Sequence, residues 1–391
     1  MQTTGKALLL TSFLALMPIV ATYAKGDGEG PRLLRWGRQL LSYIDTLALK
    51  GVDRDYIGVP ERPWQVVVRG NTNRASLDMS STINDNDIFA YIEGEIDCDY
   101  HIRSGQESYV GVWGGYRGYG LGYSRAVGAA SDGSLLTLGM TGSHYGLNLR
   151  HHHFLTDEIE VHDRCTIMGN TVDTTAAERL ASPVHVRSVI VDAYYMFNGR
   201  RFSYSAAYDQ SAYQLRSAGS FMVGAMYYYA NIDYADPQND EPIFLMDDIG
   251  QLRQWQFSLG AGYAYNYVPT RGVLVSAMLM PMLTAYNRLQ TYRYNSVLKQ
   301  FYLKQSDIGI VDLIEMDEAG KTIWPDEKRH KTSEMSRMTL NFNARASVTW
   351  NIGERAYLNA YGQLYNFRFR HDNNRGALTE WFVNAALGLR F

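Results

Sequence analysis

The chain has 391 residues, with 37 lysines and arginines against 40 aspartates and glutamates, which gives a formal net charge of -3. This near-neutral balance gives no support for a nucleic-acid partner. The counts of 35 glycines and 29 tyrosines are high. Both residue types are common in β-barrel walls, where aromatic residues form interfacial girdles and glycine relieves crowding between strands.

The first 24 residues resemble a secretory signal peptide. Lys6 supplies a positive charge, residues 7–20 form an apolar core, and Thr22-Tyr23-Ala24 is a plausible cleavage site with Ala24 as the last residue removed. An uncleaved anchor is the alternative, but the apolar core is shorter than the ~20 residues that a spanning helix needs. We therefore expect an exported mature chain.

Residues 25–62 form an N-terminal segment in which residues 31–50 predict a short amphipathic helix. Pro31 suits its first position and Gly51 its end. A cap over the barrel mouth is the favoured interpretation, and a plug or a periplasmic contact surface is the alternative. Apolar and basic residues recur at helical spacing: Leu33, Leu34, Leu40, Leu41, Ile44 and Leu47, with Arg32, Arg35 and Arg38 on the remaining surface.

Residues 63–391 are dominated by a period of two, which is typical of strands with one apolar and one polar face. An aromatic final residue, Phe391, resembles the signal that outer-membrane barrels present to their assembly machinery. The apolar positions of the last strand are Trp381, Val383, Ala385, Leu387, Leu389 and Phe391.

The other periodic runs predict strands longer than the ~5–6 residues of soluble proteins, as a tilted membrane strand requires. Lipid offers no partner for backbone N–H and C=O groups, so such strands must close into a barrel. An even strand number requires residues 201–213 to be a strand, or an earlier strand to be hidden. We predict about 12 strands, with 10 to 14 possible. The runs are residues 64–73, a hairpin over 108–127, part of 134–154, 189–197, 221–229, 254–266, 273–279, 338–350 and 357–369.

Connection lengths predict the orientation of this barrel. Residues 269–272 and 351–354 are short turns, expected on the periplasmic side, whereas residues 231–250, 285–335 and 370–378 are expected outside as loops. Residues 79–106 are acidic and predict a long polar loop. Cys98 and Cys165 lie in polar surroundings and predict either a disulfide or two unrelated thiols.

One stretch, Tyr194 to Phe221, resembles a signature of a Bacteroidota outer-membrane family, called domain of unknown function 4421. The Tyr116-Arg117-Gly118 turn followed by Leu121-Gly122-Tyr123-Ser124, and Asp45-Thr46 leading to Trp64, resemble it as well. Ser205 stands where the family tends to have proline. The resemblance spans about residues 45–391 and implies a barrel, without an activity or catalytic residues.

The residues that could bind a metal or catalyse a reaction are dispersed along the chain. His151-His152-His153 suggests a metal site, but adjacent strand residues face opposite ways, which favours a solvated rim. No catalytic, cofactor-binding or metal-binding residues are assigned, and no cofactor is expected. The inward positions include the residue types of a hydrolytic triad, namely Ser258, Ser347, His144 and Asp192. They also include Arg69, Arg117, Arg150, Arg345 and Arg390, which favour an anion path unless loop carboxylates pair with them, and Tyr194, Tyr228 and Met226, which narrow the lumen.

We therefore predict a protein of the cell outer membrane, in contact with outer-membrane lipid and with the barrel-assembly machinery through its last strand. The favoured role is a non-enzymatic narrow pore or a structural or interaction barrel. An outer-membrane enzyme acting on lipid or peptide is the first alternative. A secreted soluble β-sandwich is the second, and it requires the apolar faces to pack against each other.

Overall fold

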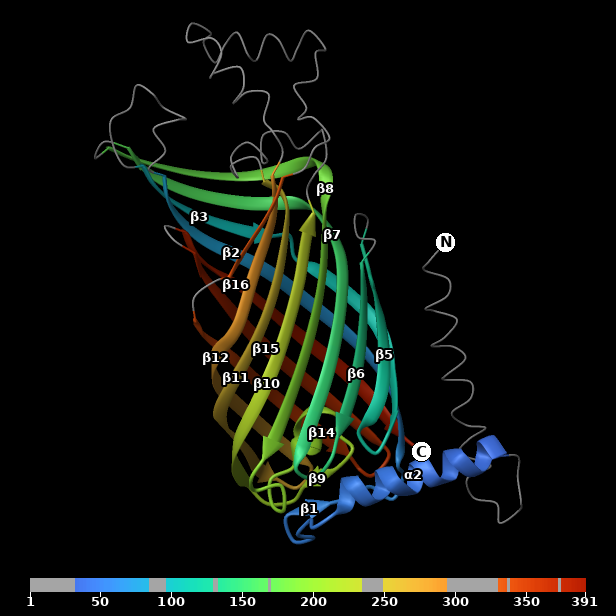
Figure 1. Cartoon of the computed structure of the whole chain (residues 1–391). Helices are drawn as coiled ribbons and strands as arrows, with labels where there is room; N and C mark the ends of the chain where they lie inside the picture. The colour runs from blue at the N-terminus through green and yellow to red at the C-terminus, as the bar shows by residue number, and fades with distance from the viewer. Residues whose placement is uncertain are drawn as a thin grey trace, which may run out of the picture.

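The computed structural model describes residues 32–83, 96–128, 133–167, 170–233, 249–293, 330–335, 338–371 and 374–391. The predicted signal peptide lies outside these residues. One antiparallel sheet closes on itself as a 12-stranded barrel, because β11 pairs with β12 and β16 pairs with β2 (Figure 1). The barrel strands are β2 (Trp64–Ile83), β4 (Glu107–Tyr116), β5 (Tyr119–Ala126), β6 (Ser134–Thr141), β7 (Tyr145–Ile167), β8 (Asn170–Met196), β10 (Ala218–Asp233), β11 (Ile249–Thr270), β12 (Val273–Arg293), β14 (Leu340–Ile352), β15 (Ala356–His371) and β16 (Asn374–Arg390).

The predicted faces of the wall are confirmed. On β11, Leu259 is 51% exposed, whereas its neighbour Ser258 is 1% exposed. Leu387 on the last strand is likewise 49% exposed, so the soluble sandwich is excluded by the outward position of the apolar side chains. At about 3.3 Å per residue and a tilt of about 40°, the ten residue steps from Trp255 to Tyr265 on β11 rise about 25 Å, the height of an apolar membrane band.

The two ends of the chain meet at the seam of the barrel. The backbone N–H of Phe391 donates to the carbonyl of Trp64 at 3.0 Å, and the Trp64 N–H donates back at 3.3 Å. The ladder between β16 and β2 continues from Arg390, opposite Gln65, to Asn374, opposite Ser81. The last residue therefore takes part in closing the barrel.

The strand that was hidden in the sequence lies early in the chain. Residues 134–154 hold two strands, β6 and β7, joined by residues 142–144. Of the two alternatives for an even strand number, the earlier hidden strand is confirmed and the strand at 201–213 is wrong, because this stretch contains a helix, α3 (Tyr204–Tyr208), followed by β9 (Tyr213–Gln214). The hairpin turn at Arg117 and Gly118 is confirmed, with φ of 50° and 86°, the positive values that a two-residue hairpin turn requires.

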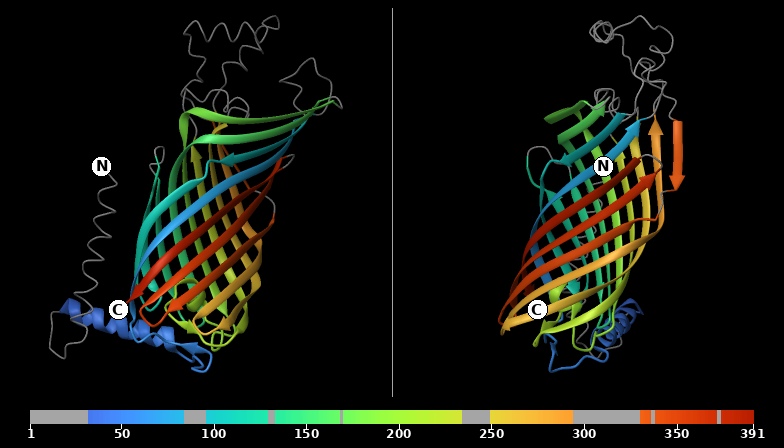
Figure 2. Two further views of the ribbon diagram at one scale, coloured as in Figure 1. Left: turned by 180° about the vertical axis from the view of Figure 1, so that it is seen from behind. Right: turned by 90° about the vertical axis from the view of Figure 1, so that its left-hand side faces the viewer.

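Several strands continue above the barrel wall. β3 (Ile96–Ser104) pairs with both β2 and β7, and β13 (His330–Met335) pairs with β12. Together with the upper parts of β7 and β8, β3 forms a sheet extension that bends across the upper end (Figure 2). The predicted loop at 79–106 is therefore partly strand, and most of the predicted loop at 370–378 is strand as well, because β15 extends to His371 and β16 begins at Asn374. The centres of the other predicted outer loops, 234–248 and 294–329, lie outside the described residues.

The register of this extension bears on the two cysteines. Cys98 on β3 is the direct partner of Cys165 on β7. Directly opposed residues in antiparallel strands have Cα atoms about 4.5–5.5 Å apart, a separation within the disulfide range. We expect thiol titration of unreduced, denatured protein to find no reactive thiol, and to find two after reduction. Two reactive thiols before reduction would leave the alternative of unrelated cysteines.

The N-terminal segment lies at the lower end of the barrel. The predicted helix is present as α2 (Arg32–Leu49), but it runs outward past the barrel wall instead of covering the mouth (Figure 1). After it, β1 (Ile57–Gly58) pairs with β9. Among the described residues, no helix is long and apolar enough to span a membrane.

Candidate functional site: the barrel lumen

A folded segment fills the lower end of the lumen. Residues 197–217, here called the plug, connect β8 to β10 and contain α3. Ser203 caps this helix by accepting a hydrogen bond from the Ala206 N–H at 3.1 Å. Phe202 and Ala207 are fully buried, so the plug packs inside the barrel.

Side chains of the wall hold the plug by its backbone. A short helix leaves carbonyl groups without partners, and these need donors when they are buried. Five strands supply contacts. Asn266 donates to the carbonyl of Ser203 (2.8 Å), Ser347 to that of Ala207 (2.8 Å), Gln65 to that of Asp209 (3.0 Å) and Arg390 to that of Gln210 (2.8 Å), while Thr141 on β6 bonds the Asp209 carboxylate.

Asp209 is the titratable acid of the plug. Burial raises the pKa of its carboxyl group, and the hydrogen bonds from Ser211 and Thr141 oppose that rise. A carboxyl group with a raised pKa in the folded state favours folding while protonated, and this contribution is lost as the pH rises through that pKa. Protonation of the Asp209 carboxyl group at low pH therefore favours the folded, packed plug.

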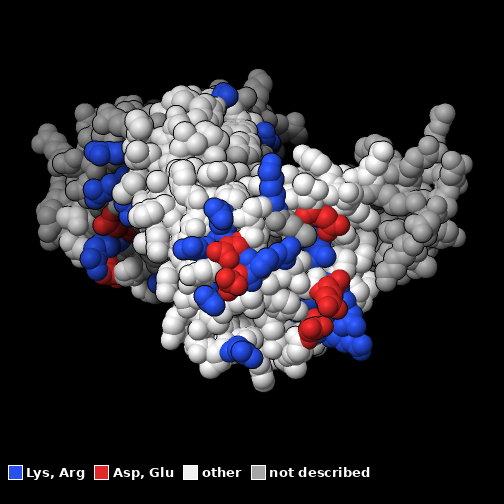
Figure 3. Space-filling view, turned by 90° about the horizontal axis from the view of Figure 1, so that it is seen from below, with Lys and Arg blue, Asp and Glu red and all other residues white. Residues whose placement is uncertain are grey.

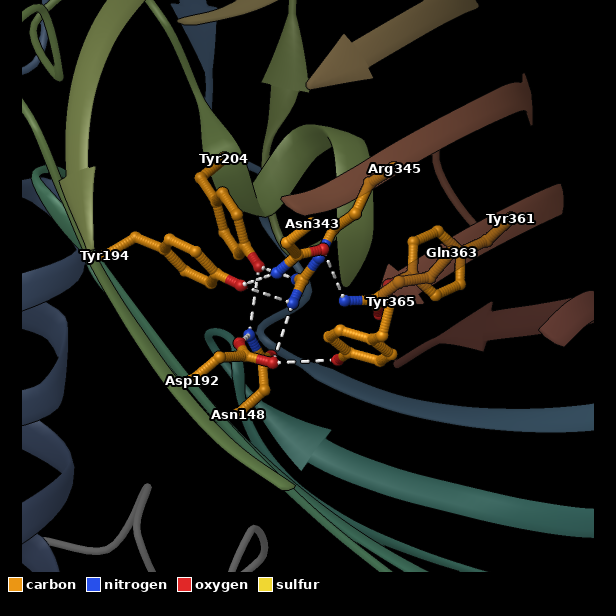
Figure 4. Close-up of polar contacts among 9 residues, drawn as sticks. All are labelled: Asn148, Asp192, Tyr194, Tyr204, Asn343, Arg345, Tyr361, Gln363 and Tyr365. Atoms are coloured by element: carbon orange, nitrogen blue, oxygen red, sulfur yellow. Dashed lines mark hydrogen bonds and ion pairs between the residues drawn. The ribbon is translucent and has the colours of Figure 1, made fainter. Parts of the chain in front are cut away.

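A buried ion pair lies directly above the plug. Arg345 on β14 reaches Asp192 on β8 at 2.8 Å, and both side chains are 2% exposed. Asp192 also accepts hydrogen bonds from Asn148 at 2.7 Å and from Tyr365 at 3.0 Å. The carboxylate therefore has partners on three other strands, which ties opposite walls of the barrel together (Figure 4).

The guanidinium of Arg345 links this cluster to the plug. It donates to the hydroxyl of Tyr194 at 2.7 Å and to the hydroxyl of Tyr204, the first residue of α3. Asn343 donates to Tyr194 as well, at 2.6 Å. Figure 4 shows these groups converging from β7, β8, β14, β15 and α3. We call Asn148, Asp192, Tyr194, Tyr204, Asn343, Arg345 and Tyr365 the central cluster.

Sulfur and aromatic side chains occupy the space above and beside the central cluster. Tyr228 and Phe367 stack across the lumen with ring centroids 3.9 Å apart. Methionine is unbranched and polarizable, so it adapts to irregular gaps between fixed groups. The buried methionines of the described residues come from three strands: Met196 on β8, Met222 and Met226 on β10, and Met278, Met280 and Met282 on β12.

A second polar group, here called the upper cluster, lies in the same lumen. Its members are Glu107, Tyr109, Arg150, His152 and Glu380, each at most 7% exposed. His152 meets the Tyr109 hydroxyl at 2.8 Å, and Tyr109 bonds Glu107. Arg150 lies 3.3 Å from Glu380. Four polar atoms of this cluster make no hydrogen bond within the described residues, namely Arg150 Nε and Nη1, His152 Nδ1 and Glu380 Oε1, although Glu380 Oε1 forms the ion pair with Arg150. Buried polar groups of this kind usually hold ordered water.

The predicted triad residues do not converge. Ser347 donates to the plug, Ser258 accepts from Asn341 at 3.2 Å, and Asp192 belongs to the central cluster. His144 was expected to face inward, but it lies in the β6–β7 turn with its ring beside Tyr195. A turn residue has no alternation to follow, which explains the error.

The prediction that five arginines face the lumen is right for four of them. Arg69, Arg150, Arg345 and Arg390 face inward, whereas Arg117 lies in a lower turn and pairs with Asp45 at 3.1 Å. The expectation that loop carboxylates pair with them is wrong for two of these inward arginines, because Arg150 and Arg345 meet acids of the wall itself. Glu380 was the partner that sequence reasoning missed, although its place between Trp381 and Thr379 on the last strand already indicated an inward position.

The three adjacent histidines alternate between the inner and the outer face of β7. His152 is 1% exposed inside the lumen, so a solvated rim is wrong for this residue. His151 and His153 are its outward neighbours and are half-buried. Within the described residues, no group of three or more His, Cys, Asp or Glu side chains is arranged to hold a metal ion.

A closed antiparallel barrel with an apolar outer face and a filled, largely polar interior has the architecture of an outer-membrane β-barrel protein. The chain belongs to the family described as Domain of unknown function (DUF4421), which matches residues 53–391. The predicted family is thereby confirmed, while an origin in Bacteroidota stays a prediction. No curated protein matches the sequence.

Solved structures similar to this chain are outer-membrane barrels. The outer membrane protease OmpT from Escherichia coli is 7% identical, with a TM-score of 0.36 over 85% of this chain and 97% of that chain. The translocator domain of autotransporter NalP from Neisseria meningitidis is 8% identical, with a TM-score of 0.31 over 91% and 95%. The outer membrane protein OprG from Pseudomonas aeruginosa is 9% identical, with a TM-score of 0.26 over 85% and 98%.

Proposed function

We propose that the protein is a non-enzymatic barrel of the cell outer membrane with a sealed lumen, and that it serves as a structural or interaction protein. The observation that carries this proposal is the continuous filling of the lumen. The plug, the central cluster and the layer of methionines and aromatic rings follow one another along the barrel axis. The plug residues Phe202, Tyr204, Ala206 and Ala207 are buried, as are all members of the central cluster except the half-buried Asn148 and all the methionines and stacked rings of the third layer.

The narrow-pore alternative is less well supported. Anion-selective pores present basic side chains to a water-filled path. Here Arg345 and Arg150 face carboxylates inside the wall, and Arg390 donates to the plug backbone. Arg69 donates to the hydroxyls of Ser124 and Thr137 at 3.2 and 2.8 Å. The lumenal arginines therefore serve packing contacts.

An enzyme is also less well supported than a structural barrel. The upper cluster contains the pair of a histidine and a carboxylate that acid–base chemistry uses, with His152 Nδ1 3.7 Å from Glu380. However, both side chains are at least nine-tenths buried, so a lipid or peptide substrate has no access to them. The serines that a hydrolase would need are engaged elsewhere.

The proposed orientation places the lower end in the periplasm. Both the helix α2 and Phe391 lie at that end (Figure 1). The sheet extension of β2, β3, β7 and β8 then projects outside the cell, where it would provide the interaction surface. Recognition of the last strand by the barrel-assembly machinery is part of the same proposal.

Electrical recordings in planar bilayers test the sealed lumen. We expect the wild-type barrel to insert without steady conductance. A variant in which a Gly-Ser linker replaces residues 203–212, combined with Met226→Ala and Met280→Ala, should conduct because it removes the plug and thins the methionine layer. A steady anion-selective current through the wild-type protein would replace this proposal with the narrow pore.

A further inference from the structure

The helix α2 has a firm attachment to the barrel along its second half. The Asp45 carboxylate accepts hydrogen bonds from the Tyr116 hydroxyl at 2.8 Å and from Arg117 Nε at 3.1 Å. The carbonyl of Leu47 accepts from the Ser143 N–H at 3.4 Å. These contacts fix the helix to the β4–β5 and β6–β7 turns, at the level where the barrel strands end.

The first half of α2 leaves the barrel sideways. Figures 1 and 2 show the helix running outward beyond the wall, roughly at right angles to the barrel axis, at the height of the lower strand ends. Seen from below, charged groups of both signs gather over the barrel underside, and uncharged surface surrounds them (Figure 3). The helix therefore extends into the region that borders the outer, lipid-facing side of the barrel.

The apolar face of the helix continues past the point where the barrel ends. Ile44 is 8% exposed, whereas Leu40, one turn earlier on the same face, is 47% exposed and Tyr43 is 62% exposed. The polar residue Ser42 lies on the opposite side, and Thr46 lies between Ser42 and Tyr43 around the helix. The face that is buried beneath the barrel at Ile44 is thus uncovered at Leu40, where the wall no longer provides a partner.

The composition of α2 identifies what covers this face. The sequence of the helix holds three arginines near its start and one acid, Asp45, which the barrel already occupies. An amphipathic helix with an apolar stripe and basic residues binds in the interface of a membrane that contains anionic lipid. The lipid belt of the barrel begins at the same height.

We propose that α2 lies on the periplasmic leaflet of the outer membrane, with Leu40 and Tyr43 inserted among the phospholipids beside the barrel. This inference depends on the membrane location proposed above. The helix then attaches the lower rim of the barrel to the lipid surface, instead of forming the cap that the sequence favoured.

Labels on the two helix faces test this proposal in the full chain. In a Cys98→Ser, Cys165→Ser background, single cysteines at Leu40→Cys, Tyr43→Cys, Ser42→Cys and Thr46→Cys carry an environment-sensitive fluorophore. The barrels are folded into vesicles of phosphatidylethanolamine and phosphatidylglycerol, with and without brominated acyl chains. We expect blue-shifted emission and several-fold stronger bromine quenching at positions 40 and 43 than at position 42, with position 46 between them.

A Leu259→Cys label on the barrel wall separates the two proposals. Quenching at position 259 with equal, weak quenching at all four helix positions would overturn the membrane-bound helix while leaving the barrel in lipid. Absence of quenching at position 259 would reject the membrane location itself. Blue-shifted emission at positions 40 and 43 that lacks quenching and depends on protein concentration would identify a second copy of the chain as the partner. Heat-modifiable migration on gels confirms that each labelled variant is folded.

Discussion

Replacing Arg345 with methionine should destabilise the folded barrel by about 3–5 kcal/mol, because it leaves the carboxylate of Asp192 buried without its cation. Asn148 and Tyr365 would still donate to Asp192, but neither carries a compensating charge. The Tyr204 hydroxyl would also lose one of its two donors from the wall and keep only Asn148, so the plug should loosen. Denaturant unfolding of the barrel in lipid vesicles, followed by gel mobility without boiling, measures this effect.

Two further variants make the result interpretable. Arg271→Met changes the same residue type in the exposed β11–β12 turn and should leave stability within about 0.5 kcal/mol. Arg345→Met combined with Asp192→Met removes both charges and should recover much of the loss, since well-packed apolar pairs replace buried ion pairs at little cost. Equal stability of Arg345→Met and Arg271→Met would show that the ion pair is not formed.

Placing arginine at Leu259 should destabilise the membrane-inserted barrel by about 2–4 kcal/mol, the range for a basic residue near the middle of the lipid-facing band. Leu259 is 51% exposed and lies between the aromatic residues Trp255 and Tyr265 on β11. In water, an exposed leucine could be replaced by arginine at little cost. Unfolding titrations in phosphatidylcholine vesicles therefore report whether lipid or water surrounds the outer wall.

The matched control for this experiment is Val127→Arg. Val127 is 49% exposed, almost the same as Leu259, but it lies beyond the last residue of β5, in the connection to β6, and not within a strand of the wall. We expect this substitution to change stability by less than about 0.5 kcal/mol. A near-zero effect at both positions would mean that the outer face meets water, and the membrane location would have to be abandoned.

The wall of the barrel was largely predictable because alternation is a local property. Leu387 and Val383 point out, and Glu380 and Arg390 point in, simply because successive side chains of a strand leave opposite faces. The same rule placed Arg345, Asp192, Tyr194 and Met226 inside correctly. It failed at His144 and Arg117, which lie in turns.

The sequence predicted which residues of the candidate site face inward, but not which of them contact one another across the lumen. Asp192 and Arg345 belong to β8 and β14, which are not neighbours in the sheet, so no register along one hairpin connects them. Tyr204 was missed entirely, because the pattern of residues 201–213 left open only whether they form a strand of the wall and indicated no helix. Its contribution depends on the plug folding back into the lumen.

The sequence by itself determined that a long chain of alternating strands must close and turn its apolar side outward, since each strand carries that pattern within a few residues. The tertiary structure decided what fills the barrel. Whether residues 201–213 extend the wall or enter the lumen depends on donors such as Asn266, Ser347 and Arg390, which reach the plug from distant strands. Buried polar groups must find partners, and here those partners become neighbours when the barrel closes.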